Sequence, residues 1–305
     1  MGVDAKPQSA AGYSADHTDT CEQVLVTLLS AFGTLKETLR LVGGLVPRYL
    51  TPEQLPDVPA HFGTSDVDVA LNLTVLASEN YASLAEQLKE RGFTRWVNPK
   101  NQWVSAWRWE YRISEHHAVL VEFLRGATYD CPAGQKTPID GEDVAALSIQ
   151  HLEVVHDWFE SKRIEAAMLG GRGVTIETVH YADITAFIIL KASAFHSRAA
   201  RKDAGDLIHV MQYAGTIQEV ARHFVERAQS GLHTEAIRAC RVTLQERFCG
   251  TEKTSGHEMV GPKSYAEFML GEAADGEELA QAARFASGMI ERFLMLVENE
   301  LGAIG

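Results

Sequence analysis

One short run restricts the fold of this chain more than any other, the segment DVDVAL from Asp66 to Leu71. Polar and apolar residues that alternate in this way predict a β-strand, in which residues two apart point to the same side. Asp66 and Asp68 are therefore neighbours on one face, where two like charges repel each other and resist burial. A divalent cation would relieve this repulsion, and Mg²⁺ is typically held by one or two carboxylates together with substrate phosphates. The run predicts Mg²⁺ (or Mn²⁺) chemistry on a nucleotide.

The chain as a whole divides into a mixed part and a helical part. Apolar periodicity and turn residues predict helices at 21–38 and 80–91 and strands at 39–42, 66–71, 93–97, 102–112, 117–124 and in a hairpin at 163–179. From residue 183 the pattern is helical, with breaks near Gly215, Gly231 and 250–263. We therefore expect an α+β fold, a mixed sheet flanked by helices and followed by a C-terminal helical domain. The expected boundaries are a flexible leader at 1–20, an α/β domain at 21–180 and the helical domain at 181–305.

Glu122 is a third carboxylate in unusual surroundings, because it interrupts the apolar run 119–124. An ionised carboxylate among apolar neighbours is costly unless it is paired or bound to a metal. If its strand lies beside 66–71, Glu122 joins the two aspartates as a metal ligand and helps to remove the proton of an acceptor. The alternatives are a glutamate on the one open face of an edge strand, or a glutamate paired with Arg125.

Two glycines and two hydroxyl residues flank the aspartate strand in a pattern typical of phosphate binding. Gly43 and Gly44 follow the strand 39–42 and precede a short helix. Their missing β-carbons allow the backbone to approach a phosphate, whose oxygens the N–H groups can receive. Thr64 and Ser65, just before the strand, can donate hydroxyls to the same phosphates. The simpler interpretation of both pairs is a turn and an ordinary strand entry.

A dense group of charges follows in the helical part. On one continuous helix, Arg198 and Lys202 follow Lys191 by 7 and 11 residues, so the three side chains share a face. A cationic stripe that faces the carboxylates would neutralise a triphosphate. The alternative is a solvated basic face whose charge is balanced by Asp203 and Asp206.

Composition narrows the class of partner. The net charge of −13 lacks the basic signature of most nucleic-acid binders, which weighs modestly against a large RNA or DNA acceptor. No apolar run approaches the roughly 20 residues needed to cross a bilayer. The four cysteines are scattered and form no Cys-x-x-Cys pair, which fits a reducing compartment. We expect a cytoplasmic protein without a membrane partner.

Together these segments resemble the nucleotidyltransferase superfamily, and within it the AbiEii/MenT-type toxin nucleotidyltransferases. The segments that carry the resemblance are Val42-Gly43-Gly44, Thr64-Ser65-Asp66-Val67-Asp68, Glu122 within its apolar strand, and the stretch from Lys191 through Arg198 to Lys202-Asp203-Ala204-Gly205-Asp206-Leu207. They occur in the family's order and span about residues 38–210.

The resemblance implies an enzyme that moves a nucleoside monophosphate from an NTP to an acceptor hydroxyl and releases pyrophosphate. It implies that Asp66 and Asp68 hold Mg²⁺ and that Gly43 and Gly44 cradle phosphate. It also implies that Lys191 and Asp206 complete the catalytic site. The acceptor stays open between a tRNA 3′ end, a protein and a small molecule. If the protein is the toxin of a toxin–antitoxin system, a cognate antitoxin is a further partner.

Two departures from the family pattern motivate a second hypothesis. Gly44 lies 22 residues before Asp66, a longer separation than is usual, and a Pro-rich loop accounts for the excess. The third acid is Glu122, where Asp is common, and the extra methylene shifts its carboxylate. The chain is then a catalytically silent nucleotide- or partner-binding module of the same fold. NTP binding without pyrophosphate release would distinguish this module from the enzyme.

Overall fold

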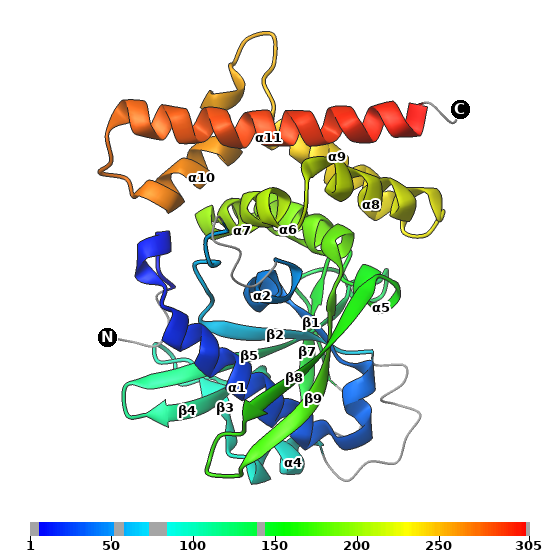
Figure 1. Cartoon of the computed structure of the whole chain (residues 1–305). Helices are drawn as coiled ribbons and strands as arrows, with labels where there is room; N and C mark the ends of the chain where they lie inside the picture. The colour runs from blue at the N-terminus through cyan, green and yellow to red at the C-terminus, as the bar shows by residue number, and fades with distance from the viewer. Residues whose placement is uncertain (1–5, 52–57, 73–83, 139–143, 303–305) are drawn as a thin grey trace. The chain divides into compact units, whose positions relative to one another are not determined.

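A computed structural model of the chain describes residues 6–51, 58–72, 84–138 and 144–302. These residues form two compact units (Figure 1). Unit 1 comprises Met1–Lys6, Ser14–Val46 and Gly63–Ala182, and unit 2 comprises Pro7–Tyr13, Pro47–Phe62 and Asp183–Gly305. The main boundary lies between Ala182 and Asp183, close to the expected one. Two segments from the first part of the chain, 7–13 and 47–62, nevertheless belong to the helical unit.

Unit 1 is built on a nine-stranded mixed sheet with helices. Its elements are α1 (Ala15–Phe32), η2 (Gly33–Thr38), β1 (Arg40–Val42), η3 (Gly43–Leu45), β2 (Asp66–Ala70), α4 (Leu84–Glu90), β3 (Phe93–Val97), β4 (Val104–Ser114), β5 (His117–Gly126), β6 (Lys136–Pro138), β7 (Ala145–Ile149), α5 (Val154–Asp157), β8 (Phe159–Ala167) and β9 (Val174–Ala182). The strand order is β3-β4-β5-β2-β1-β9-β8, and β7 pairs with both β5 and β6. The pairs β2–β5, β1–β9 and β5–β7 are parallel, and the other pairs are antiparallel.

The strands β2 and β5 lie side by side near the middle of this sheet (Figure 1). Their central residues Val67, Val69, Val121 and Phe123 are almost fully buried. Helix α1 contacts both strands and also β8 and β9. Burial of such side chains is the main source of stability for a sheet of this kind. The core of unit 1 therefore lies between α1 and the sheet.

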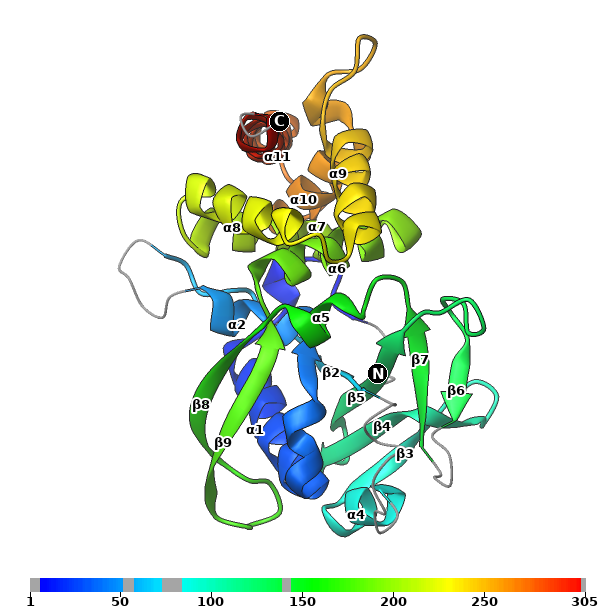
Figure 2. The ribbon, with the colours of Figure 1, turned by 90° about the vertical axis from the view of Figure 1, so that its right-hand side faces the viewer.

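Unit 2 is helical. Its elements are η1 (Ala10–Gly12), α2 (Pro47–Leu50), α6 (Ile184–Arg198), α7 (Arg201–Tyr213), α8 (Ile217–Gln229), α9 (Thr234–Phe248), η4 (Gly256–Glu258), α10 (Val260–Leu270) and α11 (Gly276–Gly302). The long helix α11 packs against α8, α9 and α10 and is seen nearly along its axis in Figure 2. Asp183 begins α6 as its N-cap, because its carboxylate accepts a hydrogen bond of 2.9 Å from the backbone N–H of Ala186.

The α+β class and most of the predicted elements are confirmed, including the hairpin predicted at 163–179 and the helix breaks after Tyr213 and Gln229. The first helix, however, starts at Ala15, inside the segment expected to be a flexible leader, and ends at Phe32. The side chain of Ser14 caps it by accepting a hydrogen bond from the N–H of His17. In the part of the chain that the structure describes, no helix combines the length and apolar character of a membrane span.

Candidate functional site

Three acidic side chains share one face of the sheet in unit 1. Asp68 on β2 is in register with Glu122 on the parallel neighbour β5, and Asp66 precedes Asp68 by two residues. Residues in register on adjacent strands, like residues two apart on one strand, project to the same face. The opposite face is covered by α1, where the rings of Phe123 and Phe32 have centroids 5.8 Å apart. We call Asp66, Asp68 and Glu122 the carboxylate triplet.

Lys6 supplies a positive charge to the carboxylate triplet. Its ammonium group pairs with a carboxylate oxygen of Asp66. Burial by itself would lower the pKa of Lys6, but attraction to Asp66, Asp68 and Glu122 raises that pKa above its ordinary value. The ammonium is therefore within electrostatic range of all three acids. A single lysine in a polar leader carries no signal of this role in the sequence.

A second cation, Arg108 on β4, pairs with Glu122. The antiparallel register places the two residues opposite each other, and Arg108 Nε lies 2.8 Å from Glu122 Oε1 without the alignment of a hydrogen bond. Glu122 is thus paired, as the simpler interpretation held, but with Arg108 and not with Arg125. Three residues along the same strand, Arg125 projects to the opposite face and donates instead to the Gly126 carbonyl and the Thr137 hydroxyl.

Gly43 packs directly against the carboxylate of Asp68. Val42, the residue before it, is the register partner of Asp68 across β1 and β2. Gly43 has a positive φ of 75°, and a Cβ placed on it would lie 2.0 Å from Asp68 Oδ2. Only glycine allows both that conformation and that approach. The long Pro-rich insertion therefore does not separate the first glycine from the aspartates, and Gly44 follows it in the buried turn η3.

Replacing Gly43 with alanine is expected to destabilise unit 1 by about 2 to 4 kcal/mol, from a strained positive φ and from overlap with Asp68. Gly171 is a matched control, because it has a similar φ of 69° but nothing within 4 Å of the added Cβ. Its alanine variant should lose about 1 kcal/mol from the backbone term alone. Urea unfolding measures both variants. Equal losses of unfolding free energy in the two variants would mean that overlap with Asp68 does not destabilise the protein.

The two hydroxyl residues before β2 differ in their environment. Thr64 is buried, and its hydroxyl donates a hydrogen bond of 2.9 Å to Asp66 Oδ1. Its backbone N–H is held by the hydroxyl of Thr18 on α1. Thr64 thus orients the Asp66 carboxylate, and this use of its hydroxyl competes with the predicted phosphate contact. Ser65 lies at the bend between Thr64 and β2.

The carboxylate triplet is not gathered into a ready-made metal site. Among the described residues, no three His, Cys, Asp or Glu side chains are arranged to hold a metal ion. Lys6 instead pairs with Asp66, and Arg108 pairs with Glu122. Two observations nevertheless fit a divalent cation: the donors are hard carboxylate oxygens, and a cationic group already lies among them. Mg²⁺ needs only one or two such carboxylates when substrate phosphates complete its shell.

The predicted basic residues of unit 2 belong to a buried ion cluster, which consists of Lys191, Arg198, Lys202, Asp203 and Asp206. Lys191 Nζ lies 2.5 Å from Asp206 and 3.2 Å from Asp203. Arg198 donates two hydrogen bonds to Asp203, of 2.7 and 2.9 Å. Lys202 donates to both oxygens of Asp206, at 2.8 and 3.0 Å. The side chain of Asp206 is fully buried.

The predicted stripe along a single helix is wrong. Helix α6 ends at Arg198, Ala199 adopts the left-handed conformation with φ 47°, and α7 begins at Arg201. The turn brings Asp206 on α7 back against Lys191 on α6. The cations gather around two carboxylates, and Lys191 is buried, so the alternative of a wholly solvated basic face is also wrong for Lys191.

The charged side chains of the buried ion cluster pair with one another within unit 2. Burial opposes ionisation of Lys191, yet Asp206 and Asp203 raise the pKa of this lysine. Burial likewise opposes ionisation of Asp206, but Lys191 and Lys202 hold its pKa well below the usual range. The cluster therefore stays charged at neutral pH and joins α6 to α7. Nucleotide contacts of Arg198 and Lys202 stay a prediction.

Two histidines extend the buried ion cluster. His61 Nε2 lies 2.9 Å from Asp206 Oδ1, and the rings of His61 and His209 have centroids 4.9 Å apart. Burial lowers the pKa of His61 to about 4. Burial, and then the neighbouring His61, lowers the pKa of His209 to about 3. Within the described residues, His209 Nε2 has no hydrogen-bond partner. Both rings are therefore neutral at pH 7.

The His209→Phe variant should resist acid better than the wild type. An unfolded histidine has a pKa of about 6.5. Because the folded pKa of His209 is lower, its contribution to stability is present above pH 6.5 and is lost as the pH falls below that value. By pH 5 this loss is about 2 kcal/mol. Urea unfolding at pH 7 and pH 5 measures this effect. Between these two pH values, the free energy of unfolding of the variant should rise by that amount relative to the wild type. Parallel pH profiles would contradict the assignment.

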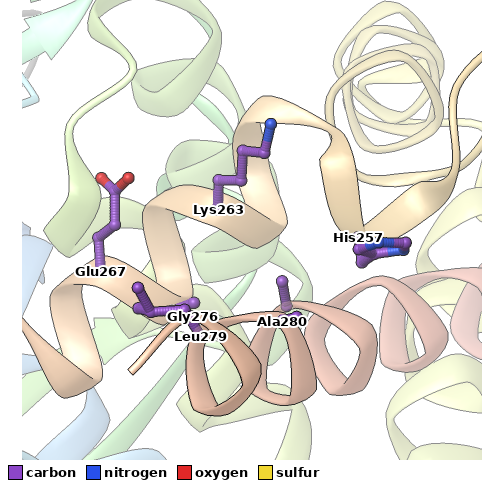
Figure 3. Close-up of a pocket in the computed structure, with 8 residues that line it drawn as sticks. His257, Lys263, Glu267, Gly276, Leu279 and Ala280 are labelled. Atoms are coloured by element: carbon purple, nitrogen blue, oxygen red, sulfur yellow. The ribbon is translucent and has the colours of Figure 1, made fainter. Parts of the chain in front are cut away.

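A cavity of about 230 Å³ lies elsewhere in unit 2, between η4, α10 and the start of α11 (Figure 3). Its lining consists of His257, Lys263, Ala266, Glu267, Gly276, Leu279, Ala280 and Ala283. None of these is a predicted site residue. The cavity is mostly apolar, and the close-up shows the Lys263 and Glu267 side chains extending away from α11.

Comparisons with known proteins do not assign a family. No family model and no curated protein matches the chain. The crystal structure of JHP933 from Helicobacter pylori is similar over 96% of this chain and 97% of that chain, with 12% sequence identity and a TM-score of 0.39. A likeness at this level is too distant to show a shared fold or function. The chain is therefore characterised by its own geometry: an α+β protein with three carboxylates on one face of two adjacent strands, beside a glycine turn.

Proposed function

We propose that the protein is a Mg²⁺-dependent nucleotidyltransferase, which moves a nucleoside monophosphate from an NTP to an acceptor hydroxyl and releases pyrophosphate. The observation that carries this assignment is the placement of Asp68, with Glu122 in register on one side and Gly43 against its carboxylate on the other. Three motifs that are distant in the sequence thus meet on adjacent strands. Their order matches the one that the family resemblance implies.

Each residue of this group has a defined part in the proposed reaction. Asp66 and Asp68 would hold the divalent ion, and Thr64 fixes the orientation of Asp66 through its hydroxyl. The bound ion would neutralise charge on the triphosphate oxygens. The backbone of the Gly43 turn can approach a phosphate because Gly43 has no side chain. Glu122 would accept the proton of the attacking hydroxyl.

The catalytic part predicted for Lys191 and Asp206 stays a prediction. Within unit 2 both side chains are buried and paired with each other. Their established effect is to connect α6 with α7. The metal contacts and the glycine-turn contact with phosphate are proposed for residues of unit 1.

The test is transfer of label from an NTP to a cell extract. With purified protein and Mg²⁺, label on the α-phosphate should enter an acceptor, and label on the γ-phosphate should leave only as pyrophosphate. Nuclease and protease treatment then show whether the acceptor is RNA, protein or a small molecule. Transfer of the γ-label to the acceptor would identify a kinase instead. Equal α-label transfer with and without a divalent ion would remove the metal from the proposal.

One observation favours the second candidate, a catalytically silent nucleotide-binding module. Glu122, the proposed proton acceptor, is already engaged by Arg108 at 2.8 Å. In a silent module this pair is permanent, and the protein binds NTP without turnover. Calorimetric NTP binding together with no pyrophosphate release in the extract assay would support the module over the enzyme.

A further inference from the structure

Lys6 occupies the part of unit 1 where a divalent cation would bind under the proposed function. Its ammonium contacts Asp66 and is attracted by Asp68 and Glu122 as well. The residue belongs to neither a helix nor a strand, and its side chain is 50% exposed. Attraction to the carboxylate triplet draws its ammonium group to this position.

The charges of this group explain why a lysine and a divalent ion would exclude each other. Lys6 pairs with Asp66, and Arg108 pairs with Glu122. A divalent ion at Asp66 would take the place of the Lys6 ammonium and bring a larger positive charge to the same acids. An ion bound beside a retained Lys6 brings two cations together, which is unfavourable.

We propose that Lys6 is an intramolecular competitor of the divalent cation, an ammonium group that must leave the carboxylate triplet before the metal can bind there. This competition rests on the proposed function and adds regulation of metal binding to it. The metal-free protein is balanced by its own lysine, and the side chain of Lys6 is released to solvent when a divalent ion binds. Metal affinity is then lower than the three carboxylates alone would give.

Manganese binding without nucleotide tests this competition directly, because Mn²⁺ is detected by electron paramagnetic resonance whether or not the protein is active. The Lys6→Met variant removes the ammonium and keeps the length of the side chain. Its dissociation constant for Mn²⁺ should fall roughly five- to tenfold, because the ion no longer has to replace the attraction between the Lys6 ammonium and Asp66, which has about this effect at high dielectric. Lys6→Arg retains the charge and should not tighten binding.

Lys36→Met is the matched control for Lys6→Met. Lys36 also belongs to unit 1 and pairs with a buried carboxylate, Glu177, at 2.6 Å. It has no part in the carboxylate triplet, so its variant should bind Mn²⁺ like the wild type. Tightening by both lysine variants would indicate a general effect of net charge and would overturn the role of Lys6.

The remaining outcomes separate this inference from the proposed function. The wild type and Lys6→Met could bind Mn²⁺ with equal affinity, in a manner that depends on Asp68. That result would overturn the competition by Lys6 but would still support the metal site. No Mn²⁺ binding by either protein at millimolar concentration would contradict both. As a second readout, an amine-reactive acyl ester followed by mass spectrometry should label Lys6 faster once Mn²⁺ is added. Unchanged labelling of Lys6 at saturating Mn²⁺ would contradict its release.

Discussion

The Asp68→Asn variant should transfer label from NTP at least a thousandfold more slowly than the wild type while it remains fully folded. A thousandfold loss corresponds to about 4 kcal/mol of barrier, and a positioned metal ion supplies several kcal/mol of charge stabilisation. Asparagine keeps the size of the side chain but is a much weaker ligand for a hard cation. The measurement is the rate of α-label transfer in the extract assay.

Stability decides whether this loss reflects function or folding. Asp68 is next to Asp66 and Glu122, so removal of its charge relieves repulsion between like charges. Because this gain is offset by the lost attraction between Asp68 and Lys6, the melting temperature of Asp68→Asn should stay close to that of the wild type. A carboxylate whose role is structural behaves in the opposite way, because its removal breaks a favourable pair.

Glu177→Gln provides the structural comparison. Glu177 is a buried carboxylate on β9 that accepts a hydrogen bond of 2.6 Å from Lys36. Its glutamine variant should lower the melting temperature and leave the rate of label transfer within about twofold of wild type. If Asp68→Asn instead keeps its rate and loses stability as Glu177→Gln does, Asp68 is a structural residue and the proposed function is wrong.

The carboxylate triplet could be predicted from local pattern, but its surroundings could not. Alternation in β2 places Asp66 and Asp68 on one face, because the period of a strand is fixed by its backbone. That Glu122 lies in register with Asp68 depends on pairing between residues 54 positions apart in sequence, which no local pattern specifies. Lys6 was missed for the same reason. Lys6 lies outside helices and strands, so no periodic pattern in the sequence predicts which residue it contacts.

Gly43 and Ala199 illustrate two kinds of error in prediction from sequence: a contact that the spacing argues against, and a helix end that the residue type does not signal. The 22 residues between Gly44 and Asp66 weaken the expectation that the glycines belong to the site, yet Gly43 contacts Asp68 because the insertion begins after the turn. At Ala199, by contrast, neither glycine nor proline marks the end of α6. Alanine favours helix, so propensity predicts continuity there. The buried pairing of Lys191 with Asp206 is the tertiary interaction that accompanies the break.

The Lys191→Met variant is expected to lose about 3 kcal/mol of unfolding free energy, a loss in the same range as that of Gly43→Ala. Removal of one partner from a buried ion pair typically costs about 3 to 5 kcal/mol, because a charge is left uncompensated. The lower end applies here, since Asp206 keeps its two hydrogen bonds from Lys202. Urea unfolding at pH 7 measures the loss. Arg238→Met, which breaks an exposed pair with Glu235 in the same unit, should leave stability unchanged within error.

A second substitution distinguishes an uncompensated charge from a simple packing defect in Lys191→Met. If the cost comes from the Asp206 carboxylate, adding Asp206→Asn should recover part of the lost stability. The acid response should change as well. In the wild type the depressed pKa of Asp206 gives stability above about pH 4 that is lost as the pH falls through the folded value. Without Lys191 that folded value rises toward the unfolded one, so less stability should be lost on acidification. A double variant weaker than either single one, with an unchanged acid response, would show that Lys191 acts through packing alone.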